Sequence, residues 1–427
     1  MNRRPWYHSI TRDPWQSLFA AFLGWMLDAM DVMLYAFALI AIREEFQLSN
    51  AMAGGLASIT LLTSAFGGIL LGFIADKIGR VRALVYAILI YSVFTALTAT
   101  ANSLGELILW RSLVGIGLGG EWSAGSVLVA ETWPAEHRGK AIGLMQSGWA
   151  LGYILAALLT ASVLPDYGWR SLFVLGLLPA LLTLWIRRQV AEPAIWLARK
   201  AEEAAGRAGE EAGLHSHSET KPLREIFRPP LMQKTLIATL ITSSVLFAYW
   251  GLFTWIPAFL SSPIAHGGAG MTIVKSSAWI IPMQAGAFLG YISFGFLADR
   301  FGRRPAFIGY LIAAAIMVPL YGHLARNATL LLLLGPLIGF FGHGYFSVFG
   351  AMLAEIFPTK VRGSAQGFAY NAGRAFSALA PFTIGAMAEV WGLGSALTLT
   401  SVFFLLGAGL MLFMPETRGS QLDVHSL

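Results

Sequence analysis

Twelve long apolar runs constrain this chain more than any other feature of its sequence. A helix crosses the hydrocarbon core of a bilayer with about 20 mostly apolar residues, and each run has roughly that length. Charged residues make up only 12% of the 427 residues, about half of the share in soluble domains. A bilayer supplies an apolar exterior and removes the need for a charged surface. The sequence therefore predicts an all-α membrane protein, and it disfavours a soluble enzyme, a secreted domain or a nucleic-acid binder despite a net charge of +6.

The runs fall into two sets of six, separated by a polar stretch. We predict an N-terminal six-helix bundle over 1–187, a cytoplasmic linker over 188–233 and a C-terminal six-helix bundle over 234–427. The first run is too long for a signal peptide and contains two aspartates, so we interpret it as a retained helix. The predicted transmembrane helices are 18–42, 53–75, 82–101, 106–130, 141–164, 169–187, 234–260, 272–298, 305–324, 329–354, 364–389 and 394–414.

The distribution of Lys and Arg predicts the orientation. Of 29 basic residues, 23 lie in segments on the side of the N-terminus or at the span ends next to them, four lie in the opposite loops or at the span ends next to those, and two lie deep within spans. Cytoplasmic loops carry the excess of Lys and Arg, so we expect both termini in the cytoplasm. The chain is then a multi-pass protein of the cell membrane.

Cysteine is absent, which excludes disulfides and thiolate chemistry. His215 and His217 lie in the linker without further candidate ligands, and we expect no metal there. No cofactor motif, nucleophile elbow or metal-ligand spacing is present. We therefore expect neither an enzyme nor a cofactor, apart from protons as a coupling ion.

Two motifs occur once in each half at almost the same offset. The sequence GFIADKIGR at 72–80 matches GFLADRFGR at 295–303, and AETWP at 130–134 matches AEIFP at 354–358. Each of the latter is followed by an Arg-Gly pair. Duplicated six-helix halves place the substrate at their interface, near the middle of the membrane, where rocking exposes it to either side.

These residues resemble the major facilitator superfamily. The Gly-x-x-x-Asp-Lys/Arg-x-Gly-Arg loops are its most specific signature, and both copies are intact. Arg111-x-x-x-Gly115-x-Gly117 is similar to its second signature. The resemblance covers the whole chain, and it implies twelve helices in two pseudo-symmetric bundles and transport by alternating access.

Several segments narrow the resemblance. Pro5-Trp6-Tyr7, the stretch GWMLDAMD at 24–31 and GGEW at 119–122 look most like the sialate:proton symporters, which carry sialic acid or small monocarboxylates. The paired aspartates also resemble the aromatic acid:proton symporters. PETRG at 415–419 is similar to a sugar-porter ending, but the Gln-Gln pair of sugar porters and the Gly-Pro signature of drug antiporters are missing.

Charged side chains within the spans are the candidates for proton coupling. Ionisable groups at membrane depth are costly and usually face a cavity. Asp28 and Asp31 share a helix face, and a rise of about 1.5 Å per residue places Glu121 level with Asp28. Carboxylates close together in a low-dielectric cavity cannot all ionise cheaply. We predict that these three carboxylates hold the proton, with Arg111 biasing which one does; the alternative is a structural Asp31–Arg111 pair.

The second half supplies the candidates for substrate binding. Arg374 lies near the middle of its span, and a guanidinium there can bind a carboxylate with two hydrogen bonds. Tyr370 and Asn371 follow the same helix face, and the alternative for Arg374 is a structural ion pair with a first-half carboxylate. His343, Gln284 and Gln146 are further candidates, although His343 is at least as well explained as a structural residue. Trp250 is among the aromatic candidates for the pocket wall.

The loop motifs predict a gate. Their charged residues can form cytoplasmic ion pairs that hold the outward-open state and break when the inner gate opens. These eight candidates are Asp76, Arg80, Glu131, Arg138, Asp299, Arg303, Glu355 and Arg362.

Together these features predict a proton-coupled symporter that imports a small organic anion such as a monocarboxylate, sialic acid or an aromatic acid. The alternatives are a sugar or other metabolite:proton symporter, an exporter, or a non-transporting receptor on the same fold. We expect a monomer in the lipid bilayer, with the organic anion and protons as its partners and no nucleic acid.

Overall fold

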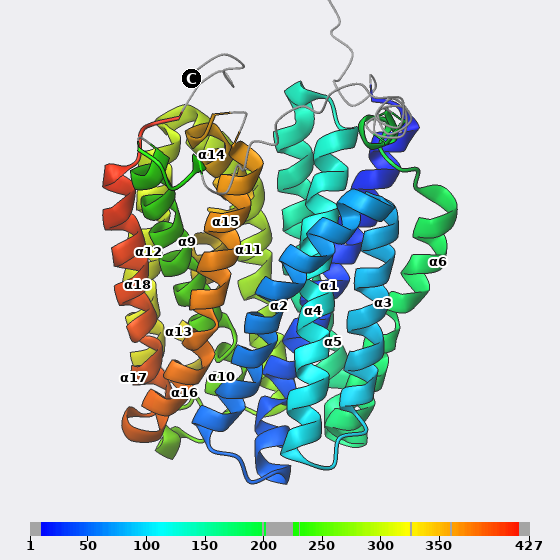
Figure 1. Cartoon of the computed structure of the whole chain (residues 1–427). Helices are drawn as coiled ribbons and strands as arrows, with labels where there is room; N and C mark the ends of the chain where they lie inside the picture. Colours follow the sequence, from blue (N-terminus) through cyan, green and yellow to red (C-terminus); the bar gives the residue numbers. More distant parts are fainter. Residues whose placement is uncertain are drawn as a thin grey trace, which may run out of the picture.

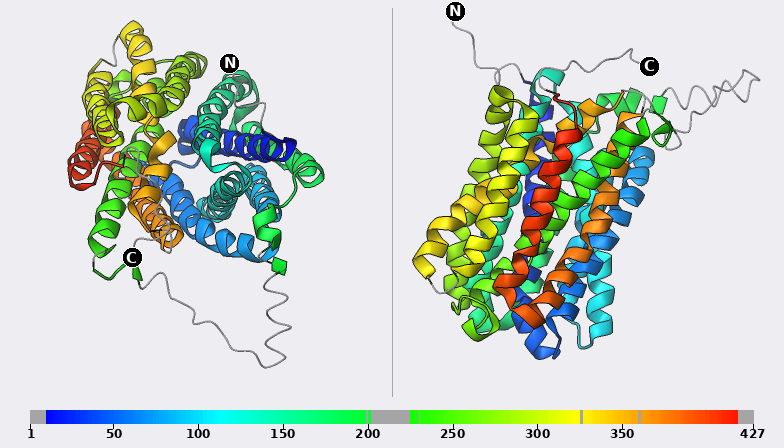
Figure 2. Two further views of the ribbon diagram at one scale, coloured as in Figure 1. Left: turned by 90° about the horizontal axis from the view of Figure 1, so that it is seen from above. Right: turned by 90° about the vertical axis from the view of Figure 1, so that its left-hand side faces the viewer.

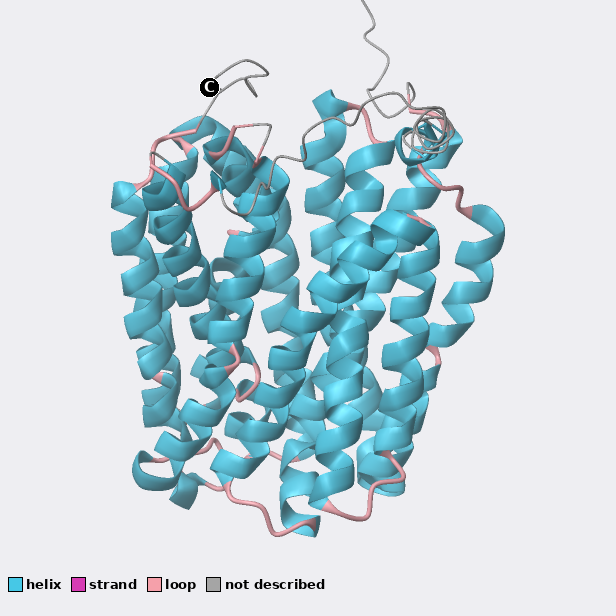
Figure 3. Cartoon of the chain, viewed as in Figure 1, coloured by secondary structure: helices cyan, strands magenta, loops and turns pink. Residues whose placement is uncertain are grey.

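The computed structural model describes residues 10–198, 200–201, 225–229, 231–324, 327–358 and 361–417. These residues form helices and turns, and none of them lies in a strand (Figure 3). The predicted linker therefore falls largely outside the described residues, together with His215, His217 and the first nine residues.

Six main helices come from the first half of the chain. They are α1 (Arg12–Glu45), α2 (Asn50–Ile78), α3 (Arg80–Thr98), α4 (Leu104–Thr132), α5 (Ala135–Val174) and α6 (Pro179–Gln189), with the short 3-10 helix η2 (Leu175–Leu177) before α6.

The second half has more interruptions. Its helices are α9 (Leu231–Phe253), α10 (Ile256–Ser261), α11 (Ile273–Phe301), α12 (Arg303–His323), α13 (Ala328–His343), α14 (Phe346–Ile356), α15 (Arg362–Ser377), α16 (Leu379–Trp391), α17 (Leu393–Leu397) and α18 (Leu399–Leu410), with the 3-10 helices η3 (Ile264–His266) and η4 (Met411–Phe413).

Ten helical segments among the described residues are long and apolar enough to cross a membrane. One of them, His137–Gln189, covers two predicted spans, and its backbone leaves the helix at Gly168, where φ is 73°. The predicted span 364–389 is not among the ten; it corresponds to α15 and α16, which meet at Ala378. The surface carries large apolar side chains, among them Phe296 at 75% and Phe66 at 65% exposure, as expected for contact with lipid.

The helices stand roughly side by side, with α1–α6 to one side and α9–α18 to the other (Figure 1). We call the end where α1 begins and η4 ends the terminal end, and the end where α1 meets α2 the far end (Figure 2). Four helices begin at the far end with a side-chain cap. Ser49, Ser103, Thr272 and Asn327 each accept a hydrogen bond from a backbone N–H in the first turn, which satisfies one of the free donors there.

The repeated loop motifs form matching turns at the terminal end. Gly79 and Gly302 have φ of 113° and 102°, a backbone conformation that glycine adopts without steric cost. Glu192 accepts hydrogen bonds from the N–H groups of Arg80, Val81 and Arg82. Glu416 accepts them from the N–H groups of Arg303 and Arg304. A carboxylate therefore caps the first turn of both α3 and α12, where it also interacts favourably with the helix dipole.

The two sides of the molecule contact each other closely at the far end, through α2 and α16. Ala51 N–H donates to Glu389 Oε1 at 2.9 Å, and Phe382 N–H donates to Ser58 Oγ at 3.1 Å. A Cβ added to Gly54 would overlap the carbonyl of Pro381, and one added to Gly385 would overlap that of Asn50. The far end is therefore held shut by backbone contacts that leave no room for side chains.

Candidate functional site

A small cavity of about 30 Å³ lies between the two sides of the molecule. Helices α1, α2, α4, α5, α9 and α15 contribute to it. Three charged residues, four hydroxyl-bearing residues and two tryptophans are among its lining: Asp28, Arg111, Arg374, Tyr35, Thr60, Ser64, Thr254, Trp149 and Trp250. Three of the predicted midspan charges therefore share one cavity.

The two aspartates of α1 have separate surroundings. Asp28 lines the cavity and interacts electrostatically with Arg374 and Asp31. Asp31 is fully buried, accepts a hydrogen bond from Thr95 of α3 at 2.7 Å, and interacts with Arg111. Asp31 thus lies among first-half residues, which favours the structural alternative for this carboxylate over a proton site.

Arg111 is buried between the cavity and α1. Its guanidinium lies 4.8 Å from the ring centroid of Tyr35, a cation–π contact that helps to hold the side chain in place. No ion pair within 4 Å joins Arg111 to a carboxylate among the described residues. The positive charge of Arg111 therefore acts on the cavity, which Arg111 lines, and also on Asp31.

Glu121 is the third buried carboxylate, with an exposure of 0%. A Cβ added to Gly24 would overlap its Oε1, so the missing side chain of Gly24 makes room for this carboxylate one turn before Asp28. Glu121 interacts electrostatically with Asp28 and with Arg374. Neither of its oxygens has a hydrogen-bond partner among the described residues. An ionised carboxylate without such partners is costly at this depth, which suits a group that carries a proton.

Arg374 is the charge that connects the halves. It lies on α15, is only 5% exposed and lines the cavity. It interacts with both Asp28 and Glu121 of the first half, yet its Nε has no hydrogen-bond partner among the described residues. The guanidinium is therefore placed to receive an acid group that enters the cavity.

Tyr370 and Asn371 lie one turn before Arg374 but do not line the cavity. The guanidinium lies 5.5 Å from the ring centroid of Tyr370. Tyr370 also stacks on Trp122 of α4, with ring centroids 4.2 Å apart and planes inclined by 7°. Asn371 donates to the carbonyl of Gly367 at 2.9 Å. Both residues therefore flank the predicted anion site at its terminal side.

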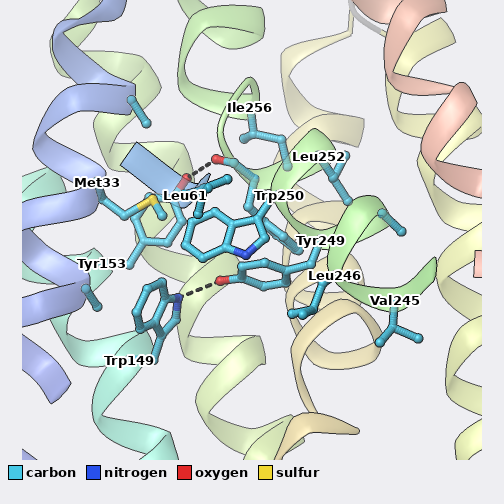
Figure 4. Close-up of a cluster of buried hydrophobic side chains, with 14 of the residues drawn as sticks. Met33, Leu61, Trp149, Tyr153, Val245, Leu246, Tyr249, Trp250, Leu252 and Ile256 are labelled. Carbon is cyan, nitrogen blue, oxygen red and sulfur yellow. Dashed lines mark hydrogen bonds between the residues drawn. The ribbon is translucent and has the colours of Figure 1, made fainter. Parts of the chain in front are cut away.

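Aromatic side chains form the wall on the side of α5 and α9. Trp149 donates to the hydroxyl of Tyr249 at 2.5 Å, and Tyr153 donates to the carbonyl of Phe253 at 3.0 Å (Figure 4). Trp250 packs edge-on to Trp149, with centroids 5.8 Å apart. These contacts join α5 of the first half to α9 of the second.

His343 lies behind this wall and does not line the cavity. Its Nδ1 lies 3.2 Å from the carbonyl of Gly339, and its Nε2 lies 3.3 Å from the hydroxyl of Tyr249. The ring of Phe253 is centred 4.1 Å away. The structural interpretation of His343 therefore fits its surroundings better than the role in substrate binding that we predicted.

The two predicted glutamines are also absent from the cavity lining. Gln284 is fully buried in α11, and its amide N and O lack hydrogen-bond partners among the described residues. Gln146 is partly buried in α5. Helical position placed them at a suitable depth but could not tell which way their side chains face.

Some of the predicted gating residues form ion pairs, and each of these pairs lies within one half of the molecule. Arg80 contacts Asp76 at 2.7 Å and Glu131 at 2.9 Å, and Arg303 contacts Glu355. Arg138 forms no ion pair among the described residues, and Asp299 is exposed. The side chain of Arg362 lies outside the described residues. These pairs therefore fix the turns of each half and do not bridge the two.

The sequence analysis missed several residues of the site. Trp149, Tyr35, Thr60, Ser64 and Thr254 line the cavity. Their residue types are common in membrane helices, so composition gave no signal. Trp122 and Thr95 were missed as partners of Tyr370 and Asp31 for the same reason. Among the described residues, no group of three or more His, Asp or Glu side chains is arranged to hold a metal ion.

Comparison with known proteins gives a consistent result. The sequence profile of the Major Facilitator Superfamily matches residues 21–293 and 276–424. The chain is 34% identical to the cis,cis-muconate transport protein of Acinetobacter baylyi over 93% of this chain and 94% of that protein. It is 30% identical to the sialic acid transporter NanX of Escherichia coli over 93% of both chains. The crystal structure of a D-xylose-proton symporter has the same fold, with a TM-score of 0.76 and 20% identity over 96% of this chain and all of that one.

Proposed function

We propose that this chain, which belongs to the Major Facilitator Superfamily, is a proton-coupled symporter that imports a small organic anion. It is a membrane-embedded transporter of small organic molecules rather than an enzyme. One observation carries the proposal. Asp28 and Arg374, from opposite halves, line the same cavity, and Glu121 is buried beside Asp28.

The anion is held by Arg374. A guanidinium can bind a carboxylate through two parallel hydrogen bonds, which fixes the orientation of the acid as well as its charge. Arg111 places a second positive charge on the cavity wall, but it is shared with Asp31. The arrangement therefore suits a substrate with one carboxylate at Arg374, and the positive charge of Arg111 would attract a second acidic group.

The proton is held by Asp28 and Glu121. Both carboxylates interact with Arg374, and two negative charges in a low-dielectric site cannot be balanced by one positive charge. A substrate carboxylate that binds Arg374 adds a third negative charge around the same guanidinium. Substrate binding therefore favours protonation of the pair, and protonation in turn frees Arg374 for the substrate. This mutual dependence is the coupling that symport requires.

The cavity wall favours flat acids over sugar acids. The hydroxyls of Thr60 and Ser64 already donate to the carbonyls of Leu56 and Leu61, and no Asn or Gln is among the described lining residues. A substrate with many hydroxyl groups would find few donors, whereas the indoles of Trp149 and Trp250 offer surfaces for a planar acid. Aromatic or other unsaturated acids are therefore better candidates than sialic acid, with small monocarboxylates between them.

The distribution of Lys and Arg supports the proposed membrane topology. In it the chain crosses the membrane twelve times, His137–Gln189 accounts for two crossings, and the terminal end faces the cytoplasm. The bundles 1–187 and 234–427 rock about the cavity during transport. A monomer is sufficient, because one chain supplies both sides of the cavity.

Uptake into liposomes tests the proposal. Purified protein is reconstituted and given an inward proton gradient, and uptake of lactate, pyruvate, sialic acid, aromatic acids and hexoses is measured. We expect accumulation of carboxylates only, and loss of accumulation when a protonophore collapses the gradient. Accumulation of a hexose would favour the sugar symporter, and proton-driven export would favour an exporter; either result contradicts the proposed function.

A further inference from the structure

Trp122 and Tyr370 form an aromatic stack that joins the two halves. Trp122 lies on α4 and Tyr370 on α15, with ring centroids 4.2 Å apart and planes inclined by 7°. No transport role was predicted for Trp122, and Tyr370 was expected to contact the substrate. Offset stacks of this kind contribute to association beyond the area that they bury, so this one resists separation of the halves.

The stack lies on the terminal side of the cavity. Leu118 of α4 and Arg374 of α15 both line the cavity. Trp122 follows Leu118 by one turn toward the terminal end of α4, and Tyr370 precedes Arg374 by one turn toward the terminal end of α15. One turn of helix is about 5.4 Å. On both helices, therefore, the stacked ring is the next layer between the cavity and the terminal end.

Each ring is next to a charged residue that has a role in the proposed function. Trp122 directly follows Glu121, and Tyr370 interacts with the guanidinium of Arg374, whose centre is 5.5 Å from the ring centroid. Trp122 and Tyr370 are only partly buried, whereas Glu121 and Arg374 behind them are 0% and 5% exposed. The rings thus cover the charges from the terminal side.

The surroundings of the stack differ from those of the far end. Cβ atoms added to Gly72, Gly143, Gly295 or Gly367, in the terminal halves of α2, α5, α11 and α15, would meet nothing within 4 Å. At the far end, the corresponding test at Gly54 and Gly385 gives overlap with the backbone of the opposite half. At these four positions, therefore, the terminal halves of the helices leave space beside the backbone that the far end does not.

We propose that the Trp122–Tyr370 stack is a gate that closes the cavity toward the terminal end. The proposal rests on the proposed function for its purpose, since a gate matters only if the cavity is a transport site. When the stack is formed, it fixes the positions of Glu121 and Arg374 relative to each other. Opening it parts α4 from α15 and exposes both charges to the terminal side. Trp122 and Tyr370 are thus positioning residues that link the proton site and the anion site.

Accessibility of a single cysteine tests the gate without using transport. The chain has no cysteine, so Ser64→Cys in the cavity wall is the one thiol. A membrane-impermeant thiol reagent is applied to the terminal side, in vesicles whose orientation is verified by protease access to a tag after Leu427. We expect Trp122→Ala and Tyr370→Ala to speed labelling by about tenfold each, because each removes the same stack. The double variant should label no faster than the single ones.

Two further variants separate the gate from general loosening. Trp110→Ala removes a stacked tryptophan from the same helix, α4, but its partner Phe94 belongs to the same half, so labelling should stay at the parent rate. Tyr370→Phe keeps the stack and removes only the hydroxyl, and it should also label at the parent rate. Unchanged labelling in both alanine variants, or an equal rise in Trp110→Ala, would overturn the gate. If the Trp122→Ala protein is not produced in the membrane, the labelling rate of Tyr370→Ala alone decides. A rise in labelling would stand even if no carboxylate were transported, so the two proposals fail separately.

Discussion

The two halves of the molecule are alike at their turns and unlike at their centres. At the terminal end, Gly79 and Gly302 make the same turn, Arg80 and Arg303 pair with the equivalent Glu131 and Glu355, and a carboxylate caps the following helix in each half. At the centre, the described residues of the first half include three buried carboxylates and one arginine. The second half has one arginine among aromatic rings.

This difference indicates a division of labour after duplication. The turns keep the same residues because both halves must build the same rigid bundle. Under the proposed function, the centres would diverge because protons and organic acids need different chemistry: carboxylates that can be neutralised on one side, and a permanent cation on the other. Arg374 would then serve both functions, since it interacts with the carboxylates across the cavity.

Replacing Arg374 should have the largest effect, because among the described residues it is the one charged residue that the second half contributes to the cavity lining. We expect Arg374→Gln to abolish measurable uptake. Loss of one partner of a buried charge pair costs about 2–5 kcal/mol of binding free energy, or more than about thirtyfold in Kd. Arg374→Lys keeps the charge but loses the two-point geometry, and should bind the acid more weakly than the parent. Substrate binding to purified protein measures both, and parent affinity in Arg374→Gln would contradict the assignment.

Removing the charge of the first-half carboxylates should separate proton-driven accumulation of the substrate from its exchange across the membrane. We expect Asp28→Asn and Glu121→Gln to lose proton-driven accumulation but to keep exchange of internal for external substrate, since exchange needs no net proton movement. Counterflow and gradient-driven uptake in the same liposomes distinguish the two activities. Asp31→Asn is the matched control, because Asp31 interacts with Thr95 and Arg111 but is not among the described residues that line the cavity; it should retain more accumulation. Full accumulation in both Asp28→Asn and Glu121→Gln would show that the carboxylates do not carry the proton.

The turns should respond to mutation in the same direction but to different degrees. Arg80 has 6% of its side chain exposed and contacts two carboxylates, whereas Arg303 has 18% exposed and contacts one. Breaking a buried pair costs about 3–5 kcal/mol, and exposed pairs cost far less. We therefore expect Arg80→Gln to lower the thermal unfolding temperature in detergent more than Arg303→Gln does. The reverse order would contradict the view that burial and the number of carboxylate partners determine how much each arginine stabilises its turn.

His343 should have the smallest effect on transport. It lies behind the aromatic wall and contacts Gly339, Tyr249 and Phe253. We expect His343→Gln to keep proton-driven accumulation and its dependence on external pH, with a modest loss of stability from altered packing. A shifted pH dependence of uptake, measured from pH 5 to pH 8 where histidine ordinarily titrates, would place His343 in the proton pathway and contradict its structural interpretation.

The architecture was largely predictable because apolar length and repeated turn motifs report directly on a membrane fold. Asp28, Arg111 and Arg374 were found because charges at membrane depth are rare enough to stand out in a sequence. The direction of a side chain around its helix was not predictable, so Asp31, His343 and Gln284 were assigned to the cavity although they are not among its described lining residues. Trp149 and Trp122 were missed because tryptophan has several roles in membrane proteins, and only contacts between halves distinguish them.

Proton uptake on substrate binding tests the central claim most directly. Purified protein in weakly buffered detergent solution, near neutral pH, is mixed with a carboxylate that it transports, and the pH is followed. We predict alkalinisation of about one proton per bound acid, because the substrate's charge at Arg374 favours protonation of Asp28 and Glu121. The Asp28→Asn, Glu121→Gln double variant should bind without this change. Binding of the acid to the parent protein with no proton taken up would contradict the account.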